Sequence, residues 1–268
     1  FNQIVRANQE GTDWWDALTE TKGQMSHQLS VSGGGEQGNY FTSFSYTNQQ
    51  GIVINTELER YTVRANTEYN LNDNIRLGEN ISFTYQENLQ AGTLEGRNAL
   101  GFWFKMHSII PVRDIRGNFA GTAAPGLGTA QNPVALRERT RNDEQESRRL
   151  FGNVFMEADF LDDFTARMEL GADLSTSFLE TFQFPTFEQA QNVTTNEFGK
   201  NVTSDRNWTW TPTLNYSSTF GSNHNVSALI GGEAVWQRRK FDGISRQDFL
   251  SFDEDFTQLG TGSGTPFI

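Results

Sequence analysis

The chain has 268 residues, of which 35% are hydrophobic and 13% aromatic, and its mean hydropathy is -0.59. No run of about 18 apolar residues occurs, which excludes a transmembrane helix, and disordered chains are depleted in aromatic residues. The absence of cysteine excludes disulfides and thiolate metal sites. A net charge of -12 argues against a nucleic-acid partner, because such proteins are usually basic.

Alternation of apolar and polar residues is the main signal along the chain. Between residues 164 and 178, the even positions are apolar except Thr176, and the odd positions are polar, charged or glycine. A strand separates such residues onto two faces, whereas a helix mixes them. Pro212 interrupts one such stretch and predicts a local bulge or kink, because proline removes a ladder donor. The other predicted strands cover residues 28–33, 40–47, 61–69, 75–85, 150–160, 208–220 and 226–236.

The connections between these strands alternate between short turns and long loops, which is typical of outer-membrane β-barrels. We therefore predict an all-β fold: a transmembrane antiparallel β-barrel wall of about eight strands with long extracellular loops. Residues 1–26 are expected to form an extracellular loop, residues 27–237 the wall, and residues 238–268 a further extracellular loop. The wall contains long loops at residues 87–147 and 179–206.

Charge placement assigns the two faces of the predicted wall. Nearly all strand charges fall on the polar face, and the apolar face carries Glu79 as an exception. A basic residue facing hydrocarbon at mid-depth costs about 2–4 kcal/mol, so we expect the apolar face to contact lipid. Aromatic residues at both strand ends predict two interfacial belts. The predicted lumen-facing charges are Arg64, Glu68, Glu157, Asp159, Arg167, Glu169, Asp173 and Glu233.

The loop at residues 87–147 is long enough to be functional as a structured unit. A short helix is expected within residues 98–108, and a second one after Asn132, whose side chain would cap it with Pro133 in the first turn. Sugar rings stack on aromatic faces, although the same aromatics could instead pack the loop or anchor the rim at the membrane interface. The candidate contacts for substrate or partner are Trp14, Trp15, Trp103, Phe104 and His107.

Catalytic and metal sites are not expected. The histidines fall at a strand start, in a loop and in a turn, and their spacing suggests no metal site. Glu157 and Asp159 could face one cavity as an acid and base, but the interpretation as charges of the wall is preferred. We therefore predict no enzyme, no cofactor and no metal.

Several motifs, in this order, resemble the barrel of SusC/RagA-type TonB-dependent transporters. They include Thr-Asp-Trp-Trp-Asp at residues 12–16, the stretch at residues 27–34, and Asn-Pro-Val-Ala-Leu at residues 132–136. Others are Tyr-Phe at residues 40–41, Gln-Gln-Gly-Ile-Val at residues 49–53, Glu-Arg-Tyr at residues 59–61 and Arg-Arg-Leu-Phe-Gly-Asn at residues 148–153. The resemblance covers residues 11–184, and the remainder reads as general barrel sequence.

This resemblance implies active import of oligosaccharides or peptides across a Gram-negative outer membrane. The implied partners are a SusD-like surface lipoprotein that acts as a lid, the TonB complex acting through a plug that is not in this chain, and outer-membrane lipid. Large plugged transporters have about 22 strands, so the resemblance implies that the eight predicted strands are part of such a larger plugged barrel. Since residue 1 is Phe and neither a TonB box nor a plug domain is visible, we expect this chain to be an internal segment of a longer protein, without the plug domain.

Two other classes remain as alternatives. A soluble β-sandwich, as in a carbohydrate-binding or adhesin-like module, would also explain the aromatics and the acidity, but not the alternation of short and long connections. A barrel enzyme would need an outward-facing Ser/His or Asp/His set, and none can be assembled.

Overall fold

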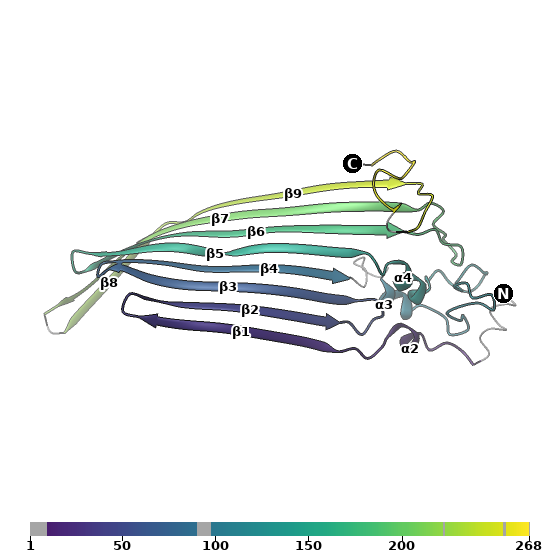
Figure 1. The fold of residues 1–268 in the computed structure, drawn as a ribbon, viewed down its shortest axis with the longest axis horizontal. Coiled ribbons are helices and arrows are strands. Elements are labelled where there is room, and N and C mark those ends of the chain that lie inside the picture. Colours follow the sequence, from purple (N-terminus) through teal and green to yellow (C-terminus); the bar gives the residue numbers. More distant parts are fainter. Residues whose placement is uncertain (1–9, 90–97, 222, 254–255, 268) are drawn as a thin grey trace.

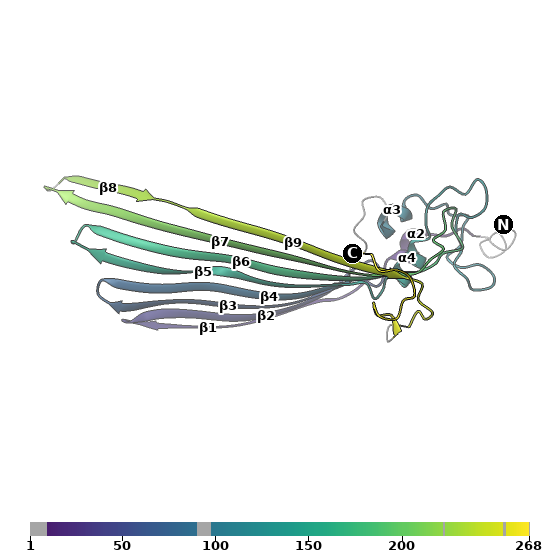
Figure 2. The ribbon, with the colours of Figure 1, turned by 90° about the horizontal axis from the view of Figure 1, so that it is seen from above.

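The computed structural model describes residues 10–89, 98–221, 223–253 and 256–267. Long antiparallel strands lie side by side, with short turns at one end and loops and helices at the other (Figures 1 and 2). The strands are β1 (Gln24–Gly35), β2 (Gly38–Gln50), β3 (Glu57–Asn72), β4 (Ile75–Leu89), β5 (Glu144–Phe160), β6 (Phe164–Gln183), β7 (Glu197–Phe220), β8 (His224–Gly231) and β9 (Ala234–Gln247). The helices are α2 (Trp14–Leu18), α3 (Ala99–Trp103) and α4 (Pro133–Arg139).

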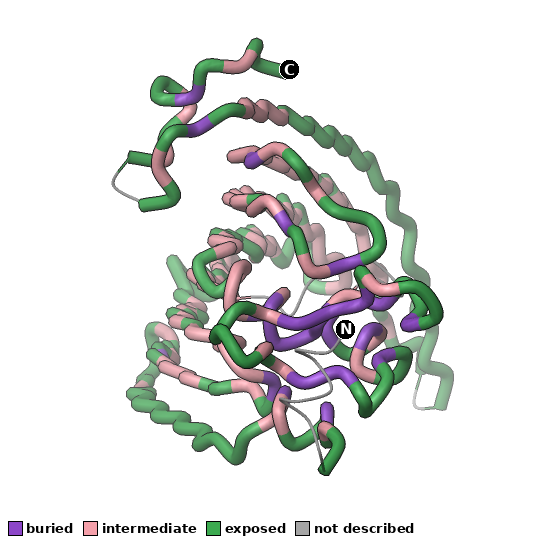
Figure 3. Tube along the Cα trace, turned by 90° about the vertical axis from the view of Figure 1, so that its right-hand side faces the viewer, coloured by how far each residue is buried: buried purple, intermediate pink, exposed green. Residues whose placement is uncertain are grey.

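The sheet is an open arc rather than a closed barrel. Strands β1 to β7 pair in chain order, and β8 and β9 follow one another along the far edge of β7. The sheet is therefore about eight strands wide, as the alternation predicts. Viewed along the strands, the backbone curves around the loops at one end (Figure 3). Among the described residues, no helix combines the length and apolar character needed to cross a membrane.

Several strands extend further toward the loops than the sequence predicts. Strand β6 continues to Gln183 and β7 begins at Glu197, so the loop expected at residues 179–206 is only residues 184–196. Strand β9 continues to Gln247, where a loop was expected from residue 238. The apolar alternation ends before these strands do, but backbone pairing continues, aided by cross-strand ion pairs such as Lys200–Glu180. Residues 1–9 of the expected first loop and residues 90–97 of the long loop lie outside the described residues.

Pro212 does not produce the bulge that the sequence suggests. Thr213 pairs with Gly231 and Trp210 pairs with Ala234, so the register is the same on both sides of the proline. The nitrogen of Gly232 still donates to the Pro212 carbonyl over 3.1 Å. Proline has no N–H to return that bond, and this explains why the ladder breaks between β8 and β9 without a shift.

The cross-strand register sorts residues onto two faces, because directly opposed residues in an antiparallel pair point the same way. One such row contains only large apolar residues at its centre: Phe44, Val63, Phe83, Leu150 and Leu174. The adjacent row contains Ser43, Arg64, Ser82, Phe151 and Asp173. The predicted apolar and polar faces are thus continuous across the sheet, and the apolar face is uncovered, with Leu170 45% exposed.

The apolar region is staggered from strand to strand. On β2, Tyr40 is the aromatic residue at the edge of the apolar region nearest the short turns. The residues at the same level as Tyr40 across the sheet are Val154 on β5 and Trp210 on β7. On β5 and β7 the aromatic edge lies further toward the turns, at Phe160 and Tyr216. A stagger of this kind is what tilted barrel strands require.

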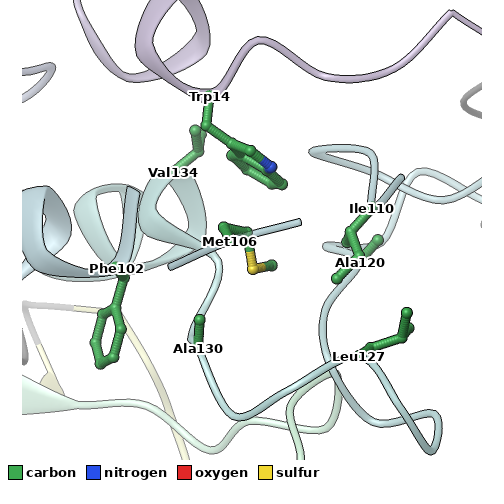
Figure 4. Packing of buried hydrophobic residues seen from close by; sticks show 8 residues of the cluster. All are labelled: Trp14, Phe102, Met106, Ile110, Ala120, Leu127, Ala130 and Val134. Atoms are coloured by element: carbon green, nitrogen blue, oxygen red, sulfur yellow. The ribbon is translucent and has the colours of Figure 1, made fainter. Parts of the chain in front are cut away.

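The buried core lies in the loops. We call residues 10–23, 51–56 and 98–143, as far as they are described, the cap. Among the described strand residues Ser43 alone is buried, and buried segments gather in the loops in Figure 3. One buried cluster consists of Trp14, Phe102, Met106, Ile110, Ala120, Leu127, Ala130 and Val134 (Figure 4).

Local capping explains where the cap helices begin. The Asn132 side chain accepts bonds from the nitrogens of Val134 and Ala135, and Pro133 occupies the first turn, as predicted. The same amide donates to the carbonyls of Val112 and Ala120 at 2.9 and 2.8 Å. Asn132 therefore also ties α4 to the loop before it, and Asn98 caps α3 in the predicted helical region.

Candidate functional site

The polar face of the sheet carries a chain of ion pairs. Arg76 of β4 pairs with Glu157 of β5, and Glu157 also contacts Arg167 of β6 at 3.3 Å. Arg167 in turn pairs with Glu169 at 2.9 Å, and Arg76 lies 3.7 Å from Glu68 of β3. Arg76 and Arg167 are each directly opposite Glu157, Glu169 lies two residues from Arg167 on β6, and Glu68 is diagonal to Arg76. The register of the sheet therefore positions the network.

Two further pairs on this face bridge other strands. Arg149 holds Asp173 through two bonds of 2.8 Å, and Arg239 holds Asp205 through bonds of 2.6 and 3.1 Å. The candidates from sequence did not include Arg149, Asp205 and Arg239, because each lies just beyond a predicted strand end. Continuing the alternation by a few residues would have found them.

The predicted wall charges thus share one face, and most are neutralised there. Asp159 accepts a bond from Thr165 over 2.6 Å rather than facing Glu157 as an acid–base partner. Within the described ranges, neither Arg64 nor Glu233 forms an ion pair, and His, Asp and Glu side chains form no group that could hold a metal. The arrangement supports a hydrated surface with little net charge.

The cap carries an aromatic cluster made of Trp15, Trp103 and Phe104, in which Trp103 is half-buried and packs against the buried core of the cap. The rings of Trp15 and Trp103 lie 4.9 Å apart, and those of Trp103 and Phe104 lie 6.3 Å apart in an edge-on arrangement. Phe104 is 82% exposed and Trp15 is 42% exposed. Ring faces presented in this way can stack on sugars or on apolar side chains of a peptide.

Two of the five residues predicted to contact substrate or partner, Trp14 and His107, are not part of this cluster. Trp14 is only 4% exposed, and its indole nitrogen donates to the backbone carbonyl of His107 over 3.1 Å. Trp14 is therefore a core residue of the cap, and its assignment as a candidate contact is wrong. His107 is exposed but makes no ring contact with the cluster among those found in the described chain.

A cavity of about 300 Å³ lies where the cap meets β6. Its walls include Leu136 and Arg139 of α4, Phe182 of β6, and Glu188 from the loop after β6. Arg139 holds both oxygens of Glu188, at 2.6 and 3.1 Å. Burial raises the pKa of the Glu188 carboxyl, but Arg139 and the backbone N–H groups of Phe187 and Glu188 together outweigh burial, so the pKa is lowered.

Asp143 borders the same cavity just before β5. Burial raises the pKa of its carboxyl to about 6, against the opposing effects of the Phe182 N–H, 2.8 Å away, and of Arg137. Arg137 is almost fully buried, and it donates to the carbonyls of Ile54 and Asn55. The Phe182–Asp143 bond joins the cap to β6, whereas the Arg137 bonds hold two segments of the cap together.

The fold is a section of a large antiparallel β-barrel wall, with its apolar face uncovered, that carries a packed cap of loops at one end. The structure of the RagAB peptide transporter matches 96% of this chain and 30% of its own length, with a TM-score of 0.78 and 21% identity. At that identity the match establishes the fold. No family model matches the chain.

The curated relatives that this chain resembles in sequence are TonB-dependent receptors. TonB-dependent receptor P26 of Formosa agariphila is 25% identical over 244 residues, which cover 88% of this chain and 23% of the receptor. SusC of Bacteroides thetaiotaomicron, also a TonB-dependent receptor, is 25% identical over 246 residues, or 83% of this chain and 24% of SusC. The chain spans about a quarter of these relatives. The resemblance to SusC/RagA-type TonB-dependent transporters is confirmed, and these relatives are receptors and transporters.

Proposed function

We propose that this chain is part of the wall and mouth of an outer-membrane TonB-dependent transporter that imports oligosaccharides or peptides. The apolar face contacts lipid tails, and the ion-paired face lines the lumen. Transport requires no bond chemistry from this chain. A plug and the TonB complex supply gating and energy from outside the chain, and a SusD-like surface lipoprotein covers the mouth.

One observation carries this proposal: the apolar face of the sheet is uncovered while the opposite face is charged and paired. On β6 the apolar stretch from Phe164 to Leu174 spans 11 residues. At about 3.3 Å per residue and a tilt near 40°, such a stretch crosses roughly 25 Å, the height of the apolar band of an outer-membrane barrel. In water, the same face would be an aggregation site.

The aromatic cluster of the cap is the best candidate for contact with the ligand or the lipoprotein. It lies at the loop end of the strands, which is the extracellular side in this proposal. A peptide ligand is favoured by the likeness to RagAB, which is named a peptide transporter, whereas stacking on ring faces suits a sugar equally well. Ligand binding by the full-length protein after Trp15→Ala and after Phe104→Ala, compared with the exposed non-cluster change Ile115→Ala, tests this role, because all three side chains are exposed.

The soluble alternative needs something to cover the apolar face. A β-sandwich would use a second sheet for this purpose, and the described residues form one sheet. The experiment below tests this alternative together with the proposal.

The test compares charge insertion on the two faces. In the full-length protein, Leu170→Arg and Ala228→Arg should abolish the folded, heat-modifiable barrel in outer-membrane fractions. Glu169→Gln, on the neighbouring polar face, should assemble normally, because glutamine can still bond to Arg167. Recovery of the protein in the soluble fraction, or equal assembly of all three variants, would contradict the proposal.

A further inference from the structure

A group of basic residues stands on the apolar face of the sheet, where basic residues are costly. Arg206 of β7 is directly opposite Leu174 of β6 on one side and Arg238 of β9 on the other. One register step further toward the loops, Lys240 is opposite Ser204. Because opposed residues share a face, all three cations point to the same side as Leu174. We call Arg206, Arg238 and Lys240 the basic row.

The basic row begins where the apolar region ends. One step toward the turns, Trp208 and Trp236 are opposite each other, and they are 40% and 48% exposed. Tryptophan at a strand end marks the membrane interface in an outer-membrane barrel. In the proposed orientation, the basic row therefore lies at the level of the lipid headgroups on the extracellular side.

No carboxylate among the described residues is ion-paired with the basic row. All three side chains are exposed. Arg206 and Arg238 are also direct cross-strand partners, and like charges in that position are destabilising. Asp242 follows Lys240 on the same face, one step beyond it. By contrast, Arg239 on the opposite face is fully paired with Asp205.

Hydroxyl groups and a fourth cation widen this surface. The row that contains Lys240 continues through Ser204 and Thr176 to Arg148 of β5. Three strand spacings separate its ends, or about 14 Å, which leaves room for more than one phosphate. Arg148 already pairs with Glu146, so it stands at the margin of the surface.

On strands β2 to β4, which β5 and β6 separate from the basic row, the loop-side edge of the apolar face is acidic. Tyr46 and Tyr61, on β2 and β3, both donate to Glu59 over 2.8 Å, and Tyr85 of β4 donates to Glu87. These carboxylates would repel an anion. The loop-side edge of the apolar face therefore favours an anion at β7 and β9 and disfavours an anion at β2 to β4.

We infer that the basic row binds the phosphate-bearing headgroup of an anionic membrane lipid, with the acyl chains lying along the Trp208–Trp236 side of the wall. An occupant that is anionic at one end and apolar at the other matches both parts of the surface. This inference rests on the proposed membrane location of the apolar face. Headgroup phosphates supply the counter-charge that the described residues do not supply there.

The experiment uses the full-length protein folded in detergent and titrated with lipid A, phosphatidylglycerol or phosphatidylcholine, with retained lipid counted by native mass spectrometry. R206Q/R238Q/K240Q should retain lipid A at least fivefold less than the wild type and should leave the weak retention of phosphatidylcholine unchanged. The matched control K22Q/R116Q/R141Q removes the same charge from exposed positions outside the row and should behave as the wild type. Equal lipid A retention by the row variant, or an equal loss in the control, would overturn the inference.

Assembly of each variant is checked by heat-modifiability. If the triple variant does not assemble, a photo-crosslinker on the wild-type background replaces it: position 236 should capture lipid A more strongly than position 61, and equal capture would overturn the inference. A protein that assembles but shows no preference for anionic lipid refutes this inference alone. A protein that is soluble without detergent and retains no lipid refutes the proposed function as well.

Discussion

The wall and the cap hold together in different ways, although they belong to one chain. The wall is a single layer in which backbone ladders set the register and side chains point to either face with little mutual burial. The cap is a small packed body with its own core around Met106 and its own buried polar network around Arg137 and Asn132. The wall therefore depends on the solvent at each face, while the cap depends on complementarity between its own side chains.

The largest effect on the cap should follow Arg137→Ala. The change leaves the carbonyls of Ile54 and Asn55 without their buried donor, and each unsatisfied group costs about 1–3 kcal/mol. We expect hydrogen exchange of α4 amides to accelerate as cap stability falls by about 3 kcal/mol or more. Arg141→Ala, at an exposed position, should change it by less than about 0.5 kcal/mol. Unchanged exchange in the Arg137 variant would show that this network does not hold the cap.

A matched pair of methionines contrasts the two regions directly. Met106→Ala opens a cavity in the cap and should cost about 2–4 kcal/mol in the stability of α3 and α4. Met156→Ala, at a wall position that is 48% exposed, removes contacts with lipid or detergent rather than with a protein core, and should cost under about 1 kcal/mol. Chemical denaturation in detergent, followed by hydrogen exchange in each region, measures both. Equal costs would mean that the wall face is buried against protein.

The junction of the two regions should respond to pH through Asp143. Its pKa is raised from 3.8 to about 6, so the folded state binds the proton more tightly than the unfolded state. The contribution of Asp143 to stability is therefore greatest below pH 4, falls as the pH rises to about 6, and levels off above it. Protection factors of amides near Phe182 should follow this curve, and Asp143→Asn should flatten it. The same slope in Asp143→Asn would assign the titration to another group.

A smaller effect is expected at the start of α3. The Asn98 side chain accepts a bond from the Gly101 nitrogen over 2.7 Å, and loss of such a cap costs about 1 kcal/mol. Asn98→Ala should loosen α3 without disturbing α4. Asn132→Ala should cost more, because it also removes bonds to Val112 and Ala120. The reverse order in hydrogen exchange would contradict the assigned roles.

The contrast between the regions also explains what the sequence could predict. Because a strand has only two faces, the alternation of apolar and polar residues around Leu170 and Arg167 was enough to assign each residue to a face. The start of α4 was predictable because Asn132 and Pro133 are adjacent to the helix in sequence. The burial of Trp14 was not predictable in this way, because its partner carbonyl belongs to His107, 93 residues further along the chain. The extensions of β6, β7 and β9 were missed because pairing there depends on backbone ladders and ion pairs rather than on apolar alternation. The basic row was missed for the same reason, since Arg238 and Lys240 fell in a segment expected to be a loop.

Spin-label accessibility along β6 tests the central claim most directly. Labels are placed singly at residues 164–174 of the full-length protein in a bilayer, and relaxation by oxygen is compared with relaxation by a water-soluble nickel chelate. The account predicts a two-residue rhythm, with oxygen favoured at even positions such as Leu170 and nickel favoured at odd positions such as Glu169. A uniform response, or the opposite phase, would contradict it.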